Sequence, residues 1–443
     1  MRECPATAGP HPTADSPVRD APEPDATLVR DAPVLDVPVL DAPVLDAPVL
    51  DLPVPPLGTM GPPAEYEQLR RECPVAKVRL PFGATAWYVT RYDDVRQLIA
   101  DPRLIRPTIN DWPARPDAND DAGAAEPGLV TMMELDGPQH LALRRALAEP
   151  FSVRAIRRQV PVMRRAADEL LDTFAAGGRP GDLVAGYLEP YPLRVMCDLV
   201  GIPYEDSEHF LPMADAALGA MLTLEEGRKV TRQLREYIGS LIDRKRRTPG
   251  DDMLTGLVRQ CDAGVVDQES VVNFGLSMLV AGYRTSTMFL ADAVVALLTE
   301  PGHYARLRDN RDLLPRAVEE LVRYVPVMNG VVVLQAVEDF ELHGQTIRAG
   351  DAVLPVLAAA NRDGTVFPDA DRLDLCRSDN PHLMFGRGAH NCIGSHLARA
   401  QMTVGLEALF DHFPNLTPAD GHPAVWDDES PSKSPLTLPV TWS

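Results

Sequence analysis

The sequence predicts a mainly α-helical fold with small β-sheets. Apolar residues recur at helical spacing over long stretches, whereas the β-rich segments are few and short. Residues 86–101 contain both patterns, because a β-rich run passes into an amphipathic helix that ends at Pro102. The other predicted helices cover residues 152–175, 205–246, 268–299, 312–324 and 393–412, and the extended segments cover 331–357 and 436–442.

The first sixty residues have a different composition from the rest. They hold 13 of the 43 prolines, and ten acidic residues against three arginines. From Asp31 a pentad repeats as DAPVL, DVPVL, DAPVL, DAPVL and DLPVP, and a proline at every fifth position forbids a continuous helix or a central strand. We therefore predict a disordered, acidic, proline-rich tail over 1–60 and a single folded domain over 61–443. The tail is either a docking or solubilising arm or a low-complexity extension upstream of a start at Met60.

The bulk composition excludes several classes of protein. A net charge of -21 argues against nucleic-acid binding, which needs clustered Lys and Arg. No run of eighteen apolar residues predicts a membrane span, and the N-terminus lacks the order of a secretory signal, so we expect a cytoplasmic protein. The six cysteines are scattered without a CxxC pair, which favours neither a disulfide framework nor a zinc ribbon.

The longest helical pattern runs from Asp267, a good N-cap, to the stop at Pro301. At 1.5 Å per residue such a helix spans roughly 50 Å, and its apolar residues on all sides predict a buried central helix. Within it lies AGYRTST, residues 281–287, where Gly282 weakens the helix and Thr285 has a hydroxyl that can bond a backbone carbonyl. This segment is either a distortion beside a cofactor or substrate, or a glycine and a threonine tolerated in a core helix.

Two further patterns carry charge or metal-binding groups. Glu320 and Arg323 stand three residues apart on one helical face, where they can pair. The stretch LMFGRGAHNCIGSHLARAQ, residues 383–401, places Cys392 before a helix expected from Ile393, whose amides and dipole would stabilise a thiolate. Its neighbouring glycines allow a tight loop and the close approach of a flat macrocycle; these are Gly386, Gly388 and Gly394.

Two other interpretations of this stretch remain open. Cys392 with His390 and His396 would supply three zinc ligands, although a convincing fourth is missing. The loop would otherwise simply enclose a structural thiol.

The segment FGRGAHNCIG, residues 385–394, matches the haem-thiolate signature FGxGxHxCxG, and the chain thereby resembles the cytochrome P-450 superfamily. The resemblance covers essentially everything after Met60, and includes AGxxT in the central helix, ExxR at Glu320 to Arg323, NRD at 361–363 and DADRLDL at 369–375. The chain is similar to the bacterial, actinomycete-type branch of the family, and more weakly to members that oxidise cyclodipeptides or couple aromatic substrates. It implies the cytochrome P-450 fold, with a long central helix over haem b.

The resemblance also implies roles for individual residues. Cys392 would bind the iron, and a thiolate there favours O–O cleavage. Phe385, Gly386 and Gly394 would lie against the cofactor, and Glu320, Arg323 and Arg372 would form a buried ion network. The residues implied to contact the haem propionates are His140 and Arg144 in DGPQHLALRR, together with His382 and His390.

Two departures from the family pattern concern the distal side and the propionates. The family usually places an acid before the helix threonine, where it helps to deliver protons; here Arg284 precedes Thr285, and Ala281 and Gly282 complete the catalytic segment. Arg284 would either hold a carboxylate or carbonyl of the substrate, or turn away and pair with an acid. The family also usually places a propionate-binding arginine where this chain has Leu334, and Gln335 is a possible replacement.

These features predict an oxidase or monooxygenase that tailors a small hydrophobic or aromatic natural product, by hydroxylation, oxidative coupling or ring formation. A peroxide-driven peroxygenase is an alternative, because such members carry Arg at the position of the acid, but they follow it with proline rather than Thr285. A haem sensor or ligand carrier without turnover is the alternative from another class. The expected substrate pocket includes Met328, Asn329, Val331, Val332 and Leu436.

Electron supply is predicted from local charge. Between His140 and Arg165 there are seven arginines and one acid, Glu149, in an otherwise acidic chain. In the P-450 fold this region borders the proximal face, so we expect ferredoxin, reduced by ferredoxin reductase, to dock there by electrostatic attraction. The docking residues expected are Arg157, Arg158 and Arg387; the alternative is a solvated helix face.

Overall fold

The protein is described by a computed structural model that covers residues 48–80, 84–107, 132–218, 224–327, 332–427 and 433–443. The chain divides into Met1–Ala47 and a compact unit, Pro48–Ser443. The predicted disorder of the tail therefore concerns residues outside the described ranges up to Ala47. The compact unit begins earlier than Gly61, because strand β1 (Val49–Asp51) pairs in parallel with residues 77–79, which belong to strand β2 of the main sheet.

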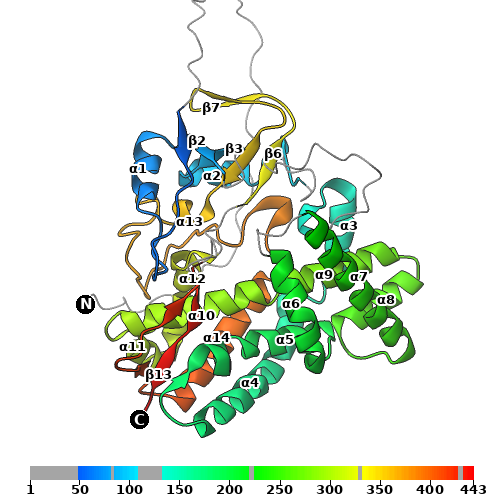
Figure 1. Cartoon of the computed structure of the whole chain (residues 1–443), viewed down its shortest axis with the longest axis vertical. Helices are drawn as coiled ribbons and strands as arrows, with labels where there is room; N and C mark the ends of the chain where they lie inside the picture. The colour runs from blue at the N-terminus through cyan, green and yellow to red at the C-terminus, as the bar shows by residue number, and fades with distance from the viewer. Residues whose placement is uncertain (1–47, 81–83, 108–131, 219–223, 328–331, 428–432) are drawn as a thin grey trace, which may run out of the picture. The chain divides into compact units, whose positions relative to one another are not determined.

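A six-stranded mixed sheet forms the β-rich part of the compact unit (Figure 1). Its strand order is β1-β2-β3-β9-β6-β4, with parallel pairs β1/β2 and β3/β9 and antiparallel pairs elsewhere. Three smaller sheets join β5, β10 and β13; β11 and β12; and β7 and β8. The remaining strands are β2 (Val75–Arg79), β3 (Thr85–Val89), β4 (Leu104–Ile105), β5 (Gly181–Asp182), β6 (Leu334–Ala336), β7 (Phe340–Leu342), β8 (Gln345–Ile347), β9 (Ala352–Pro355), β10 (Thr417–Pro418), β11 (Val425–Trp426), β12 (Pro435–Thr437) and β13 (Pro439–Thr441).

Helices make up most of the rest, and Figure 1 shows the long ones gathered away from β2, β3 and β6. Side chains cap several of them as the sequence predicts: Asp267 accepts from the amide of Ser270 at 2.7 Å. The α-helices are α1 (Glu65–Glu72), α2 (Tyr92–Leu98), α3 (Gly137–Leu147), α4 (Val153–Ala176), α5 (Pro190–Val200), α6 (Ser207–Leu218), α7 (Leu224–Arg247), α8 (Met253–Asp262), α9 (Gln268–Ala281), α10 (Arg284–Thr299), α11 (His303–Asp309), α12 (Leu314–Tyr324), α13 (Leu357–Ala360) and α14 (Ser395–His412). The short helices are η1 (Met132–Glu134), η2 (Val184–Leu188, a π-helix), η3 (Tyr204–Asp206), η4 (Arg311–Leu313) and η6 (Gly388–His390).

The predicted central helix is two helices, α9 and α10, separated at Gly282 and Tyr283. A Cβ on Gly282 would lie 2.6 Å from the carbonyl oxygen of Met278, so a larger residue would require the backbone to shift. Of the two interpretations of this segment, the structure favours a distortion, since the helix is interrupted between Ala281 and Arg284. The pattern over 205–246 likewise corresponds to two helices, α6 and α7, rather than one.

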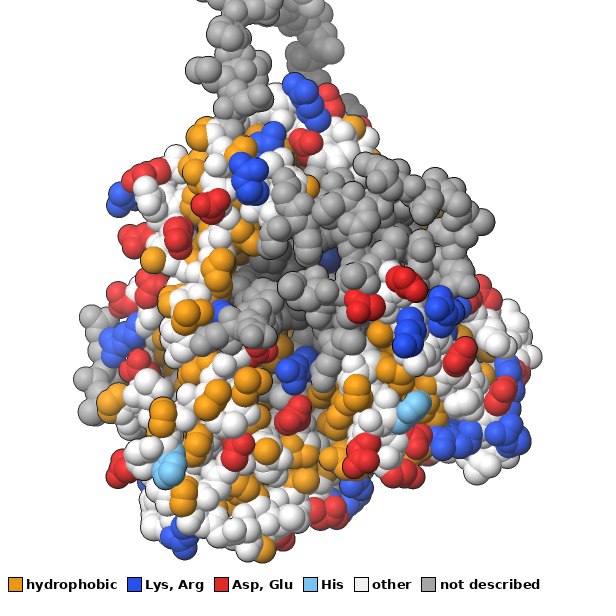
Figure 2. Space-filling view, in the orientation of Figure 1, with side chains coloured by type: hydrophobic (Ala, Val, Ile, Leu, Met, Phe, Trp, Pro, Cys, Tyr) orange, Lys and Arg blue, Asp and Glu red, His pale blue; other side chains and the backbone are white. Residues whose placement is uncertain are grey.

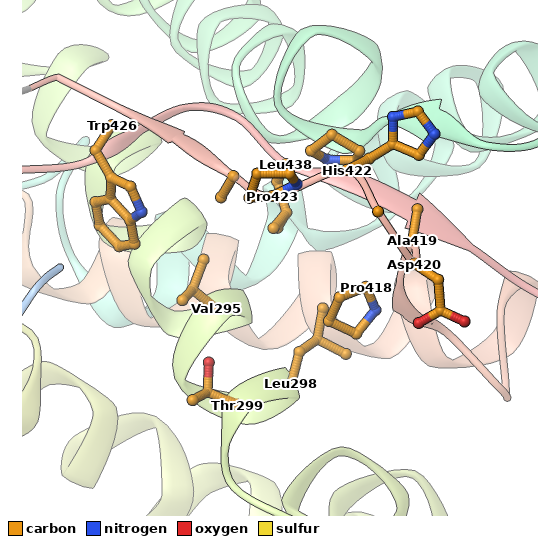
Figure 3. A pocket seen from close by; sticks show the side chains of 13 residues that line it. Val295, Leu298, Thr299, Pro418, Ala419, Asp420, His422, Pro423, Trp426 and Leu438 are labelled. Atoms are coloured by element: carbon orange, nitrogen blue, oxygen red, sulfur yellow. The ribbon is translucent and has the colours of Figure 1, made fainter. Parts of the chain in front are cut away.

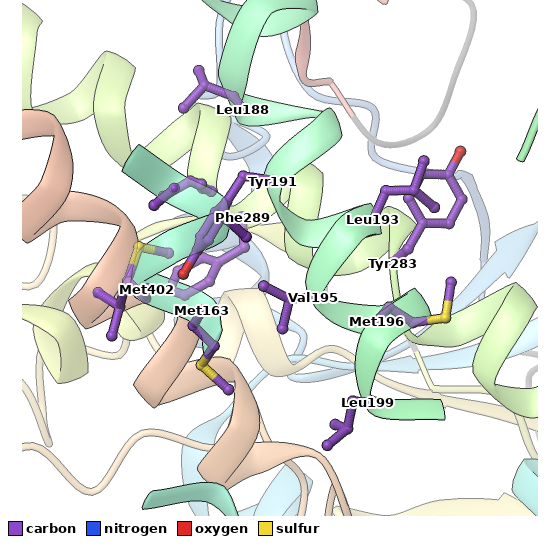
Figure 4. Close-up of a cluster of buried hydrophobic side chains, with 14 of the residues drawn as sticks. Met163, Leu188, Tyr191, Leu193, Val195, Met196, Leu199, Tyr283, Phe289 and Met402 are labelled. Carbon is purple, nitrogen blue, oxygen red and sulfur yellow. The ribbon is translucent and has the colours of Figure 1, made fainter. Parts of the chain in front are cut away.

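The helical core brings α4, α5, α10 and α14 together around interlocking side chains (Figure 4). Met163 of α4, Tyr191 and Met196 of α5, Phe289 of α10 and Met402 of α14 are all buried there. Such close packing fixes the positions of the helices that carry the functional segments.

The surface is mixed in charge on the face seen in Figure 2, where acidic and basic side chains are interspersed. Within the described ranges, no helix combines the length and apolar character needed to cross a membrane.

Candidate functional site

The loop before α14 (the Cys loop, residues 383–394) is closed by backbone hydrogen bonds. The amide of Cys392 donates to the carbonyl of Phe385 at 2.7 Å, and Gly386 and Gly388 have positive φ angles of 67° and 74°. A Cβ on Gly388 would also lie 3.2 Å from the Cβ of Ala100, so glycine permits the close approach of this loop to the end of α2. Helix α14 begins at Ser395 rather than Ile393.

The sulfur of Cys392 has a donor and two cations near it. Burial raises the pKa of the Cys392 thiol, while the amide of Gly394 and the charges of Arg144 and Arg399 act in the opposite direction. Cys392 is nevertheless accessible to solvent. A thiol that is surrounded by protein but remains accessible faces an open space, as a metal ligand on the wall of a cofactor site must.

The predicted residues His140, Arg144 and His390 are brought together beside the Cys loop. The rings of His140 and His390 stack with centroids 4.2 Å apart, and Arg144 donates from Nη2 to the carbonyl of Asn391 at 2.7 Å. His390 Nε2 lies 2.8 Å from Oδ1 of Asp136. Burial, His390 and Arg144 lower the pKa of His140 to about 4. The surroundings of His140 therefore disfavour its protonated, positively charged form.

His382, whose ring centroid lies 5.7 Å from that of Phe385, is held by a residue that was not predicted from the sequence. Its Nε2 lies 3.1 Å from Oε2 of Glu319, which also accepts from Arg399 Nη2 at 2.8 Å. Burial would raise the pKa of Glu319, but the hydrogen bonds from His382 and Arg399 lower it to about 2. Glu319 is adjacent to Glu320 of the ExxR motif. The sequence alone does not show that Glu319 contacts His382 and Arg399 whereas Glu320 pairs with Arg323.

The residues present fit a haem, on the evidence of two buried nitrogens that lack partners. Nδ1 of His382 and Nε of Arg106 are buried and make no hydrogen bond with any described residue. Buried polar atoms are normally paired, so such orphans indicate an absent acceptor. Carboxylates of a haem would be acceptors of this kind, and the accessible Cys392 sulfur would supply the axial ligand.

The buried ion network differs from the prediction in one member. Glu320 and Arg323 are fully buried, and the carboxylate accepts two hydrogen bonds from Arg323, both of 2.8 Å. The second guanidinium belongs to Arg377, whose Nε lies 3.0 Å from Oε2 of Glu320. The prediction of Arg372 was wrong: its side chain is exposed, and only its backbone carbonyl accepts from Arg323, at 3.1 Å.

The segment Ala281 to Thr285 lies at the break between α9 and α10. The hydroxyl of Thr285 donates to the carbonyl of Ala281 at 2.7 Å, so it satisfies a backbone acceptor where the helix is interrupted. Arg284 pairs with Glu189, Nη1 to Oε1 at 3.4 Å, at the start of α5. Of the two interpretations of Arg284, the structure favours the one in which the guanidinium pairs with an acid on a neighbouring helix.

The predicted substrate residues are only partly described. Met328, Asn329 and Val331 lie outside the described residues. Val332 is half-buried and its amide donates to Pro355 at 3.4 Å, and Leu436 is exposed on β12.

A separate hollow of 510 Å³ lies at the far end of α10 (Figure 3). It is lined by Val295 and Thr299 of α10 and by Trp426 of β11, among others. Val295 is ten residues from Thr285, or about 15 Å along the helix. This hollow is therefore distinct from the Cys loop and the predicted catalytic segment.

The predicted docking arginines Arg157, Arg158 and Arg387 are exposed. Arg158 makes an ion pair of 3.2 Å with Glu149, in which both side chains are largely exposed. Arg157 and Arg158 lie on α4, which packs against α14, the helix that follows Cys392. The zinc interpretation finds no support, because no group of three metal-ligating side chains occurs among the described residues.

The fold and the Cys loop together define a protein that can hold an anionic, metal-bearing macrocycle through a cysteine. The cytochrome P450 family model matches residues 222–434. A mycinamicin IV hydroxylase/epoxidase from Micromonospora griseorubida is 39% identical over 85% of this chain and 94% of its own length. A nocardicin C N-oxygenase from Nocardia uniformis subsp. tsuyamanensis is 38% identical over 85% of this chain and 94% of its own.

The solved structures agree with the sequence relatives. The LnmA cytochrome P450 hydroxylase of the leinamycin pathway of Streptomyces atroolivaceus superposes with a TM-score of 0.78 and 36% identity, over 89% of this chain and all of LnmA. This chain belongs to the cytochrome P450 family and is an oxidoreductase with a thiolate-ligated haem. The predicted family, fold and cofactor are confirmed.

Proposed function

We propose that this P450 binds its haem iron through Cys392 and oxidises a small natural product, with electrons from a ferredoxin. The observations that support the site most directly are the accessible Cys392 sulfur and the buried, unpartnered nitrogens of His382 and Arg106. The relatives described above support the substrate class, because the mycinamicin enzyme and the nocardicin enzyme are both named for natural products.

The chain's own groups have defined tasks in such a reaction. The haem supplies oxygen activation, which no side chain can provide. The Gly394 amide stabilises negative charge on sulfur, and His140, Arg144 and His382 are the residues that would hold the carboxylates of the macrocycle.

Proton delivery depends on the Thr285 hydroxyl. This hydroxyl donates to Ala281, so its free lone pairs can accept from a water and pass a proton by exchanging donors. Arg284 does not replace the family's acid in this relay, because a guanidinium remains protonated and is directed to Glu189. Water therefore takes the part of the missing carboxylate.

The reaction outcome is hydroxylation, oxidative coupling or ring formation, with aromatic peptides or cyclodipeptides among the substrates to test. Analysis of the products from the native substrate distinguishes these outcomes, since a purely hydroxylated product in stoichiometric yield would contradict coupling. The Arg284–Glu189 pair weakens the case for a peroxygenase, because it occupies the arginine on which that alternative depends.

The iron ligand is tested by the spectrum of the reduced carbonyl complex. We expect the wild-type protein to show the red-shifted Soret band of a thiolate ligand, and Cys392→Ser to lose it. Cys261→Ser is the matched control, because Cys261 is another free cysteine and lies in α8. A retained red-shifted band in the Cys392 variant would overturn the assignment.

The redox partner is tested by reversing charge on α4. We expect Arg157→Glu combined with Arg158→Glu to slow reduction by ferredoxin, more strongly at low salt, because attraction between exposed charges is screened by ions. Lys229→Glu, at an exposed position on α7, controls for a change in total charge. Equal rates in the α4 variant and the wild type would contradict docking at this face.

A further inference from the structure

The sequence lacks a propionate-binding arginine at Leu334, and the structure excludes the replacement first considered. Leu334 is buried on β6. Gln335 is the next residue on this strand and therefore points to the opposite face, where its amide donates to the carbonyl of Gly350 at 3.4 Å. Gln335 does not take the place of the missing cation.

The strand that pairs with β6 offers another cation at the same place. Strands β4 and β6 are antiparallel, with Leu104 opposite Ala336 and Ile105 opposite Gln335. Continued by one residue, this register sets Arg106 opposite Leu334. Directly opposite residues of an antiparallel pair lie on the same face, so Arg106 is on the face that Leu334 occupies.

A chain of contacts joins Arg106 to the histidines beside the Cys loop. The backbone amide of Arg106 donates to Oδ2 of Asp136 at 2.7 Å, and Oδ1 of the same carboxylate lies 2.8 Å from His390 Nε2. His390 in turn stacks on His140. Asp136 thus fixes Arg106 next to two of the residues expected at the propionates.

One nitrogen of the Arg106 guanidinium, Nε, is buried and lacks a partner among the described residues. The charge of Asp136 acts on this guanidinium, but the two oxygens of Asp136 contact the Arg106 amide and His390 rather than Nε of Arg106. Arg106 is half-buried, and a buried guanidinium nitrogen without an acceptor is costly, so the site favours an acidic group that can accept a hydrogen bond from Nε.

We propose that Arg106 binds a haem propionate and supplies the cation that Leu334 lacks. This proposal rests on the haem position given under the proposed function. The cation has moved from one strand to its partner while remaining on the same face of the pair. Neither Arg106 nor Asp136 was recognised from the sequence; the only signal was the place of Asp136 before Gly137, as the N-cap of α3.

The test measures haem retention, which does not depend on turnover. The ferric protein is mixed with excess apomyoglobin, and haem transfer is followed by absorbance. We expect Arg106→Gln to lose haem roughly 10- to 100-fold faster than the wild type, the effect of one charge-assisted hydrogen bond. Arg106→Lys retains the charge but not the planar set of donors of a guanidinium, so its rate of haem loss should lie between those of the wild type and Arg106→Gln.

A matched control and a rescue distinguish this role from a general loss of structure. Arg103→Gln removes an arginine from the same segment that already pairs with Asp101 at 2.6 Å, and should leave the rate unchanged. Leu334→Arg, added to Arg106→Gln, returns a cation from the opposite strand and should slow haem loss again.

Unchanged haem loss in Arg106→Gln would overturn the proposal, as would failure of Leu334→Arg to restore retention. If Arg106 instead binds a substrate carboxylate, its loss would weaken spin-state titrations with carboxylate substrates and leave haem transfer unaffected. The carbonyl spectrum of each variant shows separately whether the thiolate assignment holds.

Discussion

At the scale of single residues, Glu320 is a fully buried carboxylate with several hydrogen-bond donors. Its carboxylate accepts from Arg323, Arg377, the amide of Asp374 and the side chain of Asn380. A fully buried carboxylate needs such partners because water cannot reach it. The sequence identified Glu320 and Arg323 correctly, since three residues on a helix fix their proximity.

The assignment of Arg377 in place of Arg372 predicts unequal mutational costs. We expect Arg377→Ala to lower the free energy of unfolding by about 3 kcal/mol, because it removes one partner of a buried ion pair. Arg372→Ala should cost less than about 0.5 kcal/mol, as for an exposed side chain whose backbone carbonyl is retained. Denaturant unfolding of the haem-loaded proteins measures both, and equal losses would contradict the network described.

Asp292 of α10 predicts a dependence of stability on pH. It is 2% exposed, its Oδ1 has no described partner, and burial raises its pKa well above the usual range despite a hydrogen bond with Ser434. Since the folded pKa is raised, the contribution of the carboxyl to stability is complete below about pH 4, the pKa in the unfolded chain, and is lost as pH rises.

We therefore expect Asp292→Asn to be more stable than the wild type at neutral pH. The difference should increase as the pH rises above about 4, by at most about 1.4 kcal/mol per pH unit, the limit that linkage sets for one proton. Unfolding in guanidinium chloride at pH 5 and at pH 7 measures this difference in stability. Asp420→Asn, at an exposed carboxyl, provides the comparison, and a pH-independent difference would show that Asp292 is ionised in the folded protein.

The sequence predicted those site residues that share a motif with Cys392 or one helix with one another. His140 and Arg144 are one helical turn apart, and His390 is two residues from the cysteine. Glu189, Glu319, Asp136 and Arg106 could not be found in this way. Their roles depend on contacts between elements distant in the chain. Apart from the N-cap position of Asp136, their local sequence resembles that of surface charges.

At the scale of elements, the break between α9 and α10 sets the direction of Arg284. Arg284 is the first residue of α10, where a positive charge opposes the helix dipole, and Glu189 at the start of α5 compensates it. Composition predicted a weak point at Gly282. It did not predict which neighbouring helix would receive the guanidinium.

This arrangement predicts that Arg284 contributes to packing rather than to substrate affinity. We expect Arg284→Gln to change the free energy of unfolding by no more than about 1 kcal/mol, because the pair is partly exposed. Spin-state titration should give an unchanged substrate affinity. Arg194→Gln, which removes another ion pair of α5, controls for the loss of charge. Weaker binding in the Arg284 variant alone would return Arg284 to the substrate site.

At the scale of the whole molecule, the sequence predicted a mainly α fold and the cysteine site, but not the limit of the folded part. The pentad repeat suggested a tail as far as residue 60, yet Val49–Asp51 forms an edge strand on β2. Proline at every fifth position permits a strand of three residues between two prolines, which is short enough to add to a sheet edge. Local composition does not reveal this, because the partner strand decides it.

Two truncations test where folding begins. We expect deletion of residues 1–47 to leave the free energy of unfolding unchanged, because the compact unit starts at Pro48. Deletion of residues 1–59 should cost about 1–2 kcal/mol, since β2 loses the hydrogen bonds of its edge partner. Unfolding curves and light scattering measure both effects. A large loss from the shorter deletion would contradict the boundary.

The register between β4 and β6 has an evolutionary consequence. Continued by one residue, this register makes Arg106 and Leu334, 228 residues apart in the chain, neighbours on one face. A charge can then be exchanged between the two positions by two separate mutations. An intermediate with both arginines would remain viable, because a haem carries two propionates to receive them. In a sequence alignment, Leu334 marks the loss of an arginine. In the structure, Arg106 on the neighbouring strand replaces that arginine. Relatives that lack arginine in the column of Leu334 should therefore carry a base in the column of Arg106.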